Sequence, residues 1–171
     1  MNNSLLKYGL LFVFLVLLQV LVVNNTLFSG YINPHIYILF IFAFPLNKEK
    51  TPFLLLSFFL GLSIDFFSNS GGINAAATLF IAYFRLPFLH SIQKKTEFDY
   101  LLFNIKELNI IQSFTYVFTL TFLHHIIVFF LAYYKADGFL SMLYDPVLLS
   151  SILTAILIGL SISLFFSNSK K

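Results

Sequence analysis

Six apolar segments, joined by short polar stretches, make up most of this 171-residue chain. Hydrophobic residues account for 59% of the sequence and charged residues for 10%, whereas a soluble domain has about 45–50% and about 25%. A small soluble domain could not bury that much apolar surface. The sequence therefore predicts an all-α polytopic membrane protein with a single transmembrane domain over residues 1–171. The expected spans are Leu5–Val23, Pro34–Leu46, Pro52–Phe67 (to Ser70 if the helix continues), Ile73–His90, Ser113–Tyr134 and Val147–Phe166.

The second segment, Pro34–Leu46, is short, because a spanning helix needs roughly 20 apolar residues. Charge placement nevertheless predicts that it crosses. With six spans and a cytoplasmic N-terminus, nine of the ten basic residues fall inside and only Lys135 falls outside, as the positive-inside rule describes. The inner residues are Lys7, Lys48, Lys50, Arg85, Lys94, Lys95, Lys106, Lys170 and Lys171. We therefore expect both termini in the cytoplasm and an uncleaved first span, since no small-residue cleavage pattern follows it.

Small residues recur every four positions in the last segment. They are Ser151, Ala155, Gly159 and Ser163. Apolar helices in lipid pack closely where small residues face each other, so this stripe predicts a packing surface. It could serve contacts within the chain or receive a partner's transmembrane helix. A shorter stripe in the third segment contains Gly61.

Asp65 lies late in the third segment, in the expected outer half of the membrane. An ionisable residue within a span indicates a functional site by default. Asp65 could belong to an outward-opening polar site or to a buried contact between the third and fourth helices. It could also cap a helix end by bonding to the turn at residues 68–72. The residues leave these alternatives open.

Arg85, His124 and His125 are further ionisable candidates within the spans. Arg85 is near the inner end of the fourth segment, roughly 10 Å deeper than Asp65 at about 1.5 Å per residue. We therefore expect its side chain to reach the cytoplasmic interface rather than to pair with Asp65. His124 and His125 fall near the middle of the fifth segment, where we expect neutral hydrogen bonds between helices, as for Gln19, rather than a proton relay.

The inner connection Ser91–Gln112 carries apolar residues at helical spacing with polar residues between them. The apolar positions are Phe98, Leu101, Leu102, Ile105 and Leu108. This pattern predicts an amphipathic helix on the inner membrane surface, which faces either lipid or a cytoplasmic partner.

Catalytic motifs are missing from the sequence, which also contains no cysteine. There is no nucleophile elbow, no metalloprotease motif and no phosphate-binding loop. The basic residues are dispersed, unlike a nucleic-acid-binding stripe. We therefore expect a protein without enzymatic activity, cofactor, metal ion or nucleic-acid partner.

Residues 61–85 carry a more specific pattern. A Gly-Leu-x-x-Asp segment ending at Asp65 precedes a turn with two glycines, and Asn74-Ala75-Ala76 then leads into a helix that reaches Arg85. This stretch resembles the rod shape-determining MreD family. Length, six-span layout and basic inner loops agree with that family over the whole chain, although the connection Ser91–Gln112 looks longer than usual. The layout is also similar to the substrate-binding subunits of energy-coupling-factor vitamin transporters.

The resemblance implies a scaffold of the bacterial inner membrane that helps to organise peptidoglycan synthesis along the lateral wall. Such a protein binds MreC, a single-span protein, and belongs with MreB, RodZ and the RodA–transpeptidase pair. The expected partner-binding or structural residues are Gly61, Asp65, Asn74, Arg85, His125, Ser151, Ala155, Gly159 and Ser163.

The alternative function is a small-solute-binding subunit or transporter, with Asp65, Asn74 and a histidine lining an outward-facing pocket. A transport site needs several oriented polar groups that converge on the solute. Polar groups within these spans are few, which favours the scaffold.

Overall fold

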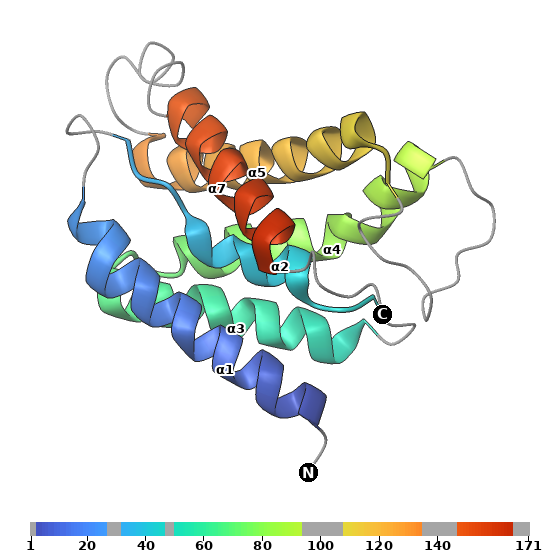
Figure 1. The fold of residues 1–171 in the computed structure, drawn as a ribbon. Helices are drawn as coiled ribbons and strands as arrows, with labels where there is room; N and C mark the ends of the chain where they lie inside the picture. The colour runs from blue at the N-terminus through green and yellow to red at the C-terminus, as the bar shows by residue number, and fades with distance from the viewer. Residues whose placement is uncertain (1–2, 27–31, 47–49, 94–107, 135–146, 166–171) are drawn as a thin grey trace.

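Helices form every regular element of the described part of the chain in a computed structural model (Figure 1). The structure describes residues 3–26, 32–46, 50–93, 108–134 and 147–165. No β-strand occurs in these ranges, which confirms the predicted all-α class. The elements are α1 (Asn3–Leu17), the π-helix η1 (Leu18–Val22), the 3-10 helices η2 (Val23–Asn25) and η3 (Ile36–Ile38), α2 (Leu39–Ala43), α3 (Thr51–Ser68), α4 (Ile73–Gln93), α5 (Ile110–Tyr133) and α7 (Leu148–Phe165).

Four helical stretches are long and apolar enough to cross a membrane: Leu6–Asn25, Thr51–Ser68, Ile73–Gln93 and Ile110–Tyr133. A further apolar helix, Leu148–Ser163, is shorter. These five stretches correspond to all the predicted spans except the second, and their ends lie within three residues of the predicted ones.

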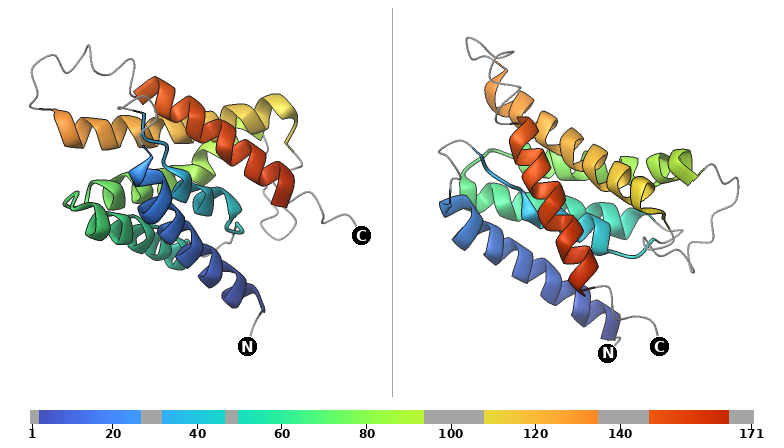
Figure 2. Two further views of the ribbon diagram at one scale, coloured as in Figure 1. Left: turned by 60° about the vertical axis from the view of Figure 1, so that its left-hand side comes forward. Right: turned by 45° about the horizontal axis from the view of Figure 1, so that its top comes forward.

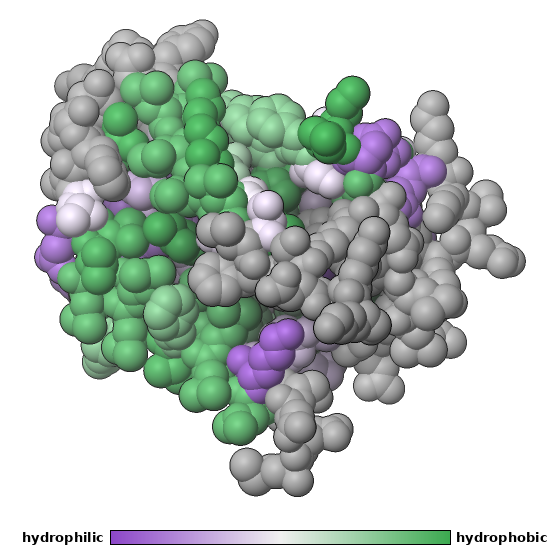
Figure 3. All heavy atoms as spheres, in the orientation of Figure 1, coloured by the Kyte–Doolittle hydropathy of each residue, from purple (hydrophilic) through white to green (hydrophobic). Residues whose placement is uncertain are grey.

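Several polar side chains lie inside the bundle, and many large apolar side chains lie on its exterior. Phe66, Leu21 and Leu10 are 82%, 64% and 62% exposed, and Figure 3 shows apolar residues covering much of the visible face. The fully buried polar residues, each 0% exposed, are Gln19, Ser57, Thr78, Thr121, His124, Ser151 and Thr154. Soluble proteins show the opposite distribution, and broad exposed apolar surface marks contact with lipid or a partner. The described residues thus have the character of a membrane protein.

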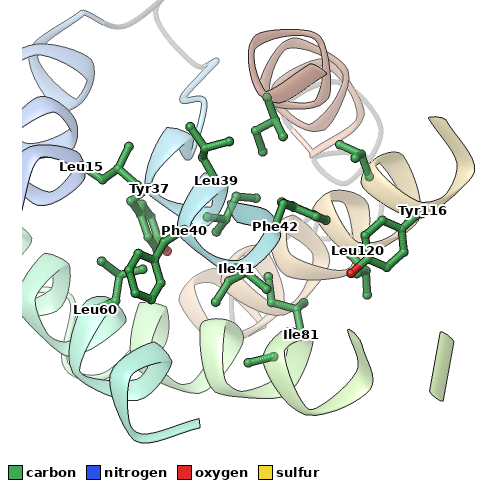
Figure 4. Packing of buried hydrophobic residues seen from close by; sticks show 14 of the residues in the cluster. Leu15, Tyr37, Leu39, Phe40, Ile41, Phe42, Leu60, Ile81, Tyr116 and Leu120 are labelled. Atoms are coloured by element: carbon green, nitrogen blue, oxygen red, sulfur yellow. The ribbon is translucent and has the colours of Figure 1, made fainter. Parts of the chain in front are cut away.

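The second apolar segment lies at the centre of the bundle. Phe40 and Ile41 are at most 1% exposed, and Figure 4 shows them among side chains from α1, α3, α4 and α5. The segment runs antiparallel to α1, as Figure 2 also shows. Its start lies beside the end of α1, where Gln19 bonds to the Pro34 carbonyl. Its end lies beside the start of α1, where the Phe44 ring packs on Tyr8 at 4.9 Å.

Two prolines, Pro34 and Pro45, confine the helical part of this segment to η3 and α2. The extended backbone before η3 would be costly in an apolar interior unless its polar groups found partners. Gln19, turned inward on the π-helix η1, provides them: its amide nitrogen donates to Pro34 O at 3.1 Å, and its oxygen accepts from Ile36 N at 2.8 Å. The hydrogen-bonding role predicted for Gln19 is confirmed.

Helix α7 satisfies two more backbone groups of the extended stretch. The Asn33 N–H donates to Ser150 Oγ, and the His35 N–H donates to Thr154 Oγ1, both at 3.1 Å. The first turns of α7 therefore hold the entry of the second segment in place.

Helices α3 and α4 form a tight hairpin. A Cβ added at Gly61 would lie 2.5 Å from Asn74 O and 2.6 Å from Ala75 Cα, so only glycine permits this approach. The turn between the helices contains three residues with positive φ: Asn69, Gly71 and Gly72. Gly61 is thus a packing residue inside the chain.

The predicted amphipathic helix falls mostly on residues 94–107, which lie outside the described residues. Helix α4 continues to Gln93 and α5 begins at Ile110, so the connection is shorter than the expected Ser91–Gln112. Asn109 and Gln112 form a capping box, with hydrogen bonds of 2.7 and 3.1 Å. This cap explains why α5 starts before the predicted Ser113.

Candidate functional site

The carboxylate of Asp65 is buried and fully engaged within the protein. Asp65 is 3% exposed. Its Oδ1 accepts hydrogen bonds from Ser70 Oγ (2.5 Å), Asn74 N (2.9 Å) and Asn74 Nδ2 (3.0 Å), and its Oδ2 accepts from Ala75 N (2.7 Å). A negative charge at these free N–H groups stabilises the start of α4. Asp65 therefore makes the expected buried contact between α3 and α4, and it caps the start of α4 rather than the turn at residues 68–72.

Asn74 connects Asp65 to the second segment through hydrogen bonds. A carboxylate only accepts hydrogen bonds, so the Asn74 amide nitrogen must face Asp65 and its oxygen must face the other way. That oxygen accepts the Tyr37 hydroxyl proton at 2.9 Å. The Tyr37 oxygen, also 2.9 Å from His124 Nε2, then accepts the Nε2 proton. A single chain of hydrogen bonds thus links α3, α4, η3 and α5.

The same reasoning assigns the protons of both histidines on α5. In the neutral ring of His124 the proton sits on Nε2, so Nδ1 carries a lone pair; this Nδ1 is buried and has no partner. His125 Nδ1 lies 2.8 Å from the Thr121 carbonyl and must donate to it. Its Nε2 therefore carries the lone pair, 3.3 Å from Thr154 Oγ1 on α7. The predicted hydrogen bond between helical segments is found for His124, whereas the hydrogen bond that His125 donates lies within α5.

His35 joins the two α5 histidines in a cluster. Its ring stacks on His125 with centroids 4.7 Å apart and an interplanar angle of 17°, and it meets His124 edge-on at 5.2 Å. One nitrogen from each ring lies within 4.8 Å of the other two. The Nδ1 of His35 is buried without a partner.

The sequence analysis missed this cluster, because 89 residues separate His35 from His124 and no motif spacing connects them. The available signal was composition. The chain has four histidines, and all four lie within the expected spans.

The side chain of Arg85 is buried inside the bundle rather than extended away from it. The residue is 4% exposed. Its Nε donates to the Tyr116 hydroxyl at 3.1 Å, its Nη2 donates to the Phe44 carbonyl at 2.6 Å, and its guanidinium lies 5.1 Å from the centre of the Phe53 ring. Because α2 ends before Phe44, that carbonyl lacks a helical donor, and Arg85 supplies one. Arg85 therefore joins α4, α5 and the end of the second segment.

The small-residue stripe of α7 divides into two halves. Ser151 and Ala155 are 0% and 9% exposed and face the bundle. Gly159 and Ser163 are exposed, and a Cβ added at Gly159 would meet nothing within 4 Å. Only the first half acts as a packing surface within the described residues.

Comparisons with protein-family models, with curated proteins and with solved structures find no match to this chain.

Proposed function

We propose that this chain is a non-enzymatic scaffold of the bacterial cytoplasmic membrane, with six spans, both termini in the cytoplasm and a role like that of the MreD family. The charge asymmetry supports the orientation. The antiparallel course of the second segment along α1 supports its crossing. The Gly-Leu-x-x-Asp pattern and its continuation to Arg85 support the role.

The observation that carries the proposal is that the motif residues bind one another. Gly61 permits the close approach of α4, Asp65 caps that helix, and Asn74 extends the contact to Tyr37. These groups hold the bundle together from inside. The surface left for function is then the apolar exterior, as a membrane scaffold requires.

The open half of α7 offers a place for a partner helix. Gly159 and Ser163 are exposed one turn apart, and the neighbouring Ile156 and Leu160 are 52% and 55% exposed. Small residues allow another transmembrane helix to come close, and the flanking apolar side chains extend the contact. In the proposed role the helix belongs to a single-span, MreC-like protein.

The alternative, a solute-binding subunit or transporter with a pocket at Asp65, draws less support. Four hydrogen bonds already occupy the two carboxylate oxygens of Asp65, and the Asn74 oxygen is taken by Tyr37. A solute would have to break these bonds before it could bind.

Co-purification tests the proposal. The chain carries an affinity tag after Lys171 and is purified in detergent from native membranes, and all co-eluting proteins are identified. A single-span, MreC-like protein is the expected partner. Gly159→Leu should reduce its recovery several-fold, because the larger side chain separates the two helices.

Gly9→Leu is the matched control, since Gly9 is also exposed on a helix with open space at its Cβ position. It should leave recovery unchanged. Recovery of an ATPase pair with a coupling subunit would overturn the scaffold and favour the transporter. Equal loss of the partner in both variants would exclude α7 as the docking helix.

A further inference from the structure

Three imidazole rings from distant parts of the chain meet inside the bundle. His35 precedes η3, while His124 and His125 lie in the middle of α5. One nitrogen of each ring lies within 4.8 Å of the others. His124 and His125 are 0% and 4% exposed, and His35 is partly exposed.

Two ring nitrogens of this cluster are buried without a hydrogen-bond partner. Among the described residues, five buried side-chain atoms lack a partner, and three of them are His35 Nδ1, His124 Nδ1 and Asn33 Oδ1. Buried polar atoms are nearly always paired, so each exception calls for a physical reason. The unprotonated Nδ1 of His124 offers a lone pair, which a cation held by the three rings would satisfy.

The protonation pattern suits metal binding. Metal ions take neutral imidazole through a nitrogen that carries a lone pair, while the other ring nitrogen usually donates to an oxygen that orients the ring. His124 donates through Nε2 to Tyr37, and His125 donates through Nδ1 to the Thr121 carbonyl. Both rings therefore have the outer hydrogen bond of a metal ligand. The second nitrogen of His124 has no partner, and the second nitrogen of His125 lies 3.3 Å from Thr154 Oγ1.

The nitrogens of the three rings lie slightly farther apart than the ligands of a metal site. In a tetrahedral site with metal–nitrogen distances of about 2.0–2.1 Å, the ligand nitrogens are about 3.4 Å apart. One nitrogen of each ring lies within 4.8 Å of the other two. Side-chain movements that shift the ring nitrogens by about 1 Å would bring them to the distances of such a site. Three histidines with a fourth position for water or another oxygen are an established zinc ligand set.

We propose that His35, His124 and His125 bind one divalent transition-metal ion of the class that prefers imidazole, such as Zn²⁺. The ion ties the start of the second segment to α5. This inference does not depend on the proposed scaffold function.

Zinc binding to the purified full-length protein tests the inference. The protein carries a tag without histidines, is stripped with a chelator in detergent and is dialysed to equilibrium against Zn²⁺, and bound metal is measured by mass spectrometry. One ion per chain is expected. Co²⁺ as a second probe should give the visible absorption of a tetrahedral site.

Substitutions locate the ion. His35→Ala and His124→Ala should each weaken Zn²⁺ binding by at least a hundredfold, because each removes one of three ligands. Tyr37→Phe should weaken it by about ten- to a hundredfold, since it removes the acceptor that orients His124. His90→Ala is the matched control and should change nothing, because His90 lies outside the cluster on α4.

Stoichiometric binding that depends on the three histidines supports the site. No Zn²⁺ above the level of the triple alanine variant would overturn it, and so would equal loss in His90→Ala. If the variants fail to fold, X-ray absorption at the zinc edge of the wild-type protein decides. Three imidazole ligands support the site, and a shell without imidazole overturns it.

Discussion

Replacing Gly61 by alanine should loosen the contact between α3 and α4. The added Cβ would lie 2.5 Å from Asn74 O and 2.6 Å from Ala75 Cα, whereas ordinary contacts are about 3.5–4.0 Å. Both atoms belong to the backbone, so α4 must move away by about 1 Å. The same movement would stretch the hydrogen bond from Ala75 N to Asp65, now 2.7 Å long, beyond its normal range.

The expected loss of stability combines three effects. Overpacking costs about 1–3 kcal/mol, and weakening one charge-assisted hydrogen bond costs about 1.5–3 kcal/mol. The higher helix propensity of alanine offsets about 1 kcal/mol. Gly61→Ala should therefore lower the free energy of unfolding by about 3 kcal/mol.

Unfolding of the purified protein by a denaturing detergent, followed by circular dichroism, measures this loss. Gly9→Ala and Gly159→Ala are the controls, since a Cβ at either position meets nothing within 4 Å. Both should be neutral or slightly stabilising, because alanine favours helix. A Gly61→Ala variant as stable as these controls would refute the close backbone approach.

Three further variants can be measured by the same titration. Asp65→Asn should cost about 2–4 kcal/mol, because an amide nitrogen would face an N–H group at the start of α4; wild-type stability would show that the carboxylate does not cap that helix. Arg85→Met should cost about 2–4 kcal/mol, since it leaves the Phe44 carbonyl without a donor, and a neutral effect would argue for an exposed arginine. Gln19→Leu should cost about 1–3 kcal/mol for each backbone group that it leaves unpaired, and the Ile36 N–H is one of these groups. An unchanged unfolding midpoint would contradict the role of Gln19 in holding the extended stretch.

Helix positions were largely predictable from the sequence because hydropathy is a local property. The start of α4 at Ile73 was predicted to the residue, since two glycines interrupt the helix just before it. Helix α7, Leu148–Phe165, differs from the predicted Val147–Phe166 by one residue at each end. A contact of Asp65 between the third and fourth helices was one of the alternatives, but the cap was expected at the turn of residues 68–72 and not at the start of α4.

Contacts between distant segments were not predictable in the same way. Arg85 is buried because Pro45 ends the helical segment and leaves the Phe44 carbonyl free, a partner that helical depth alone does not reveal. His35 meets His124 only because the second segment lies in the centre of the bundle. The stripe on α7 divides between inside and outside at Gly159, and its spacing carries no sign of that division.

The course of the second segment decides the six-span architecture, and cysteine labelling from one side of the membrane tests it directly. The chain has no cysteine of its own, so each introduced thiol reports a single position. Exposed sites are available at Asn25, Lys50, Asn69 and Ser91. In intact cells, an impermeant maleimide should label cysteines at positions 25 and 69, and should reach those at 50 and 91 only after the membrane is opened. Labelling of positions 25 and 50 from the same side would contradict the crossing of Pro34–Leu46 and with it the proposed topology.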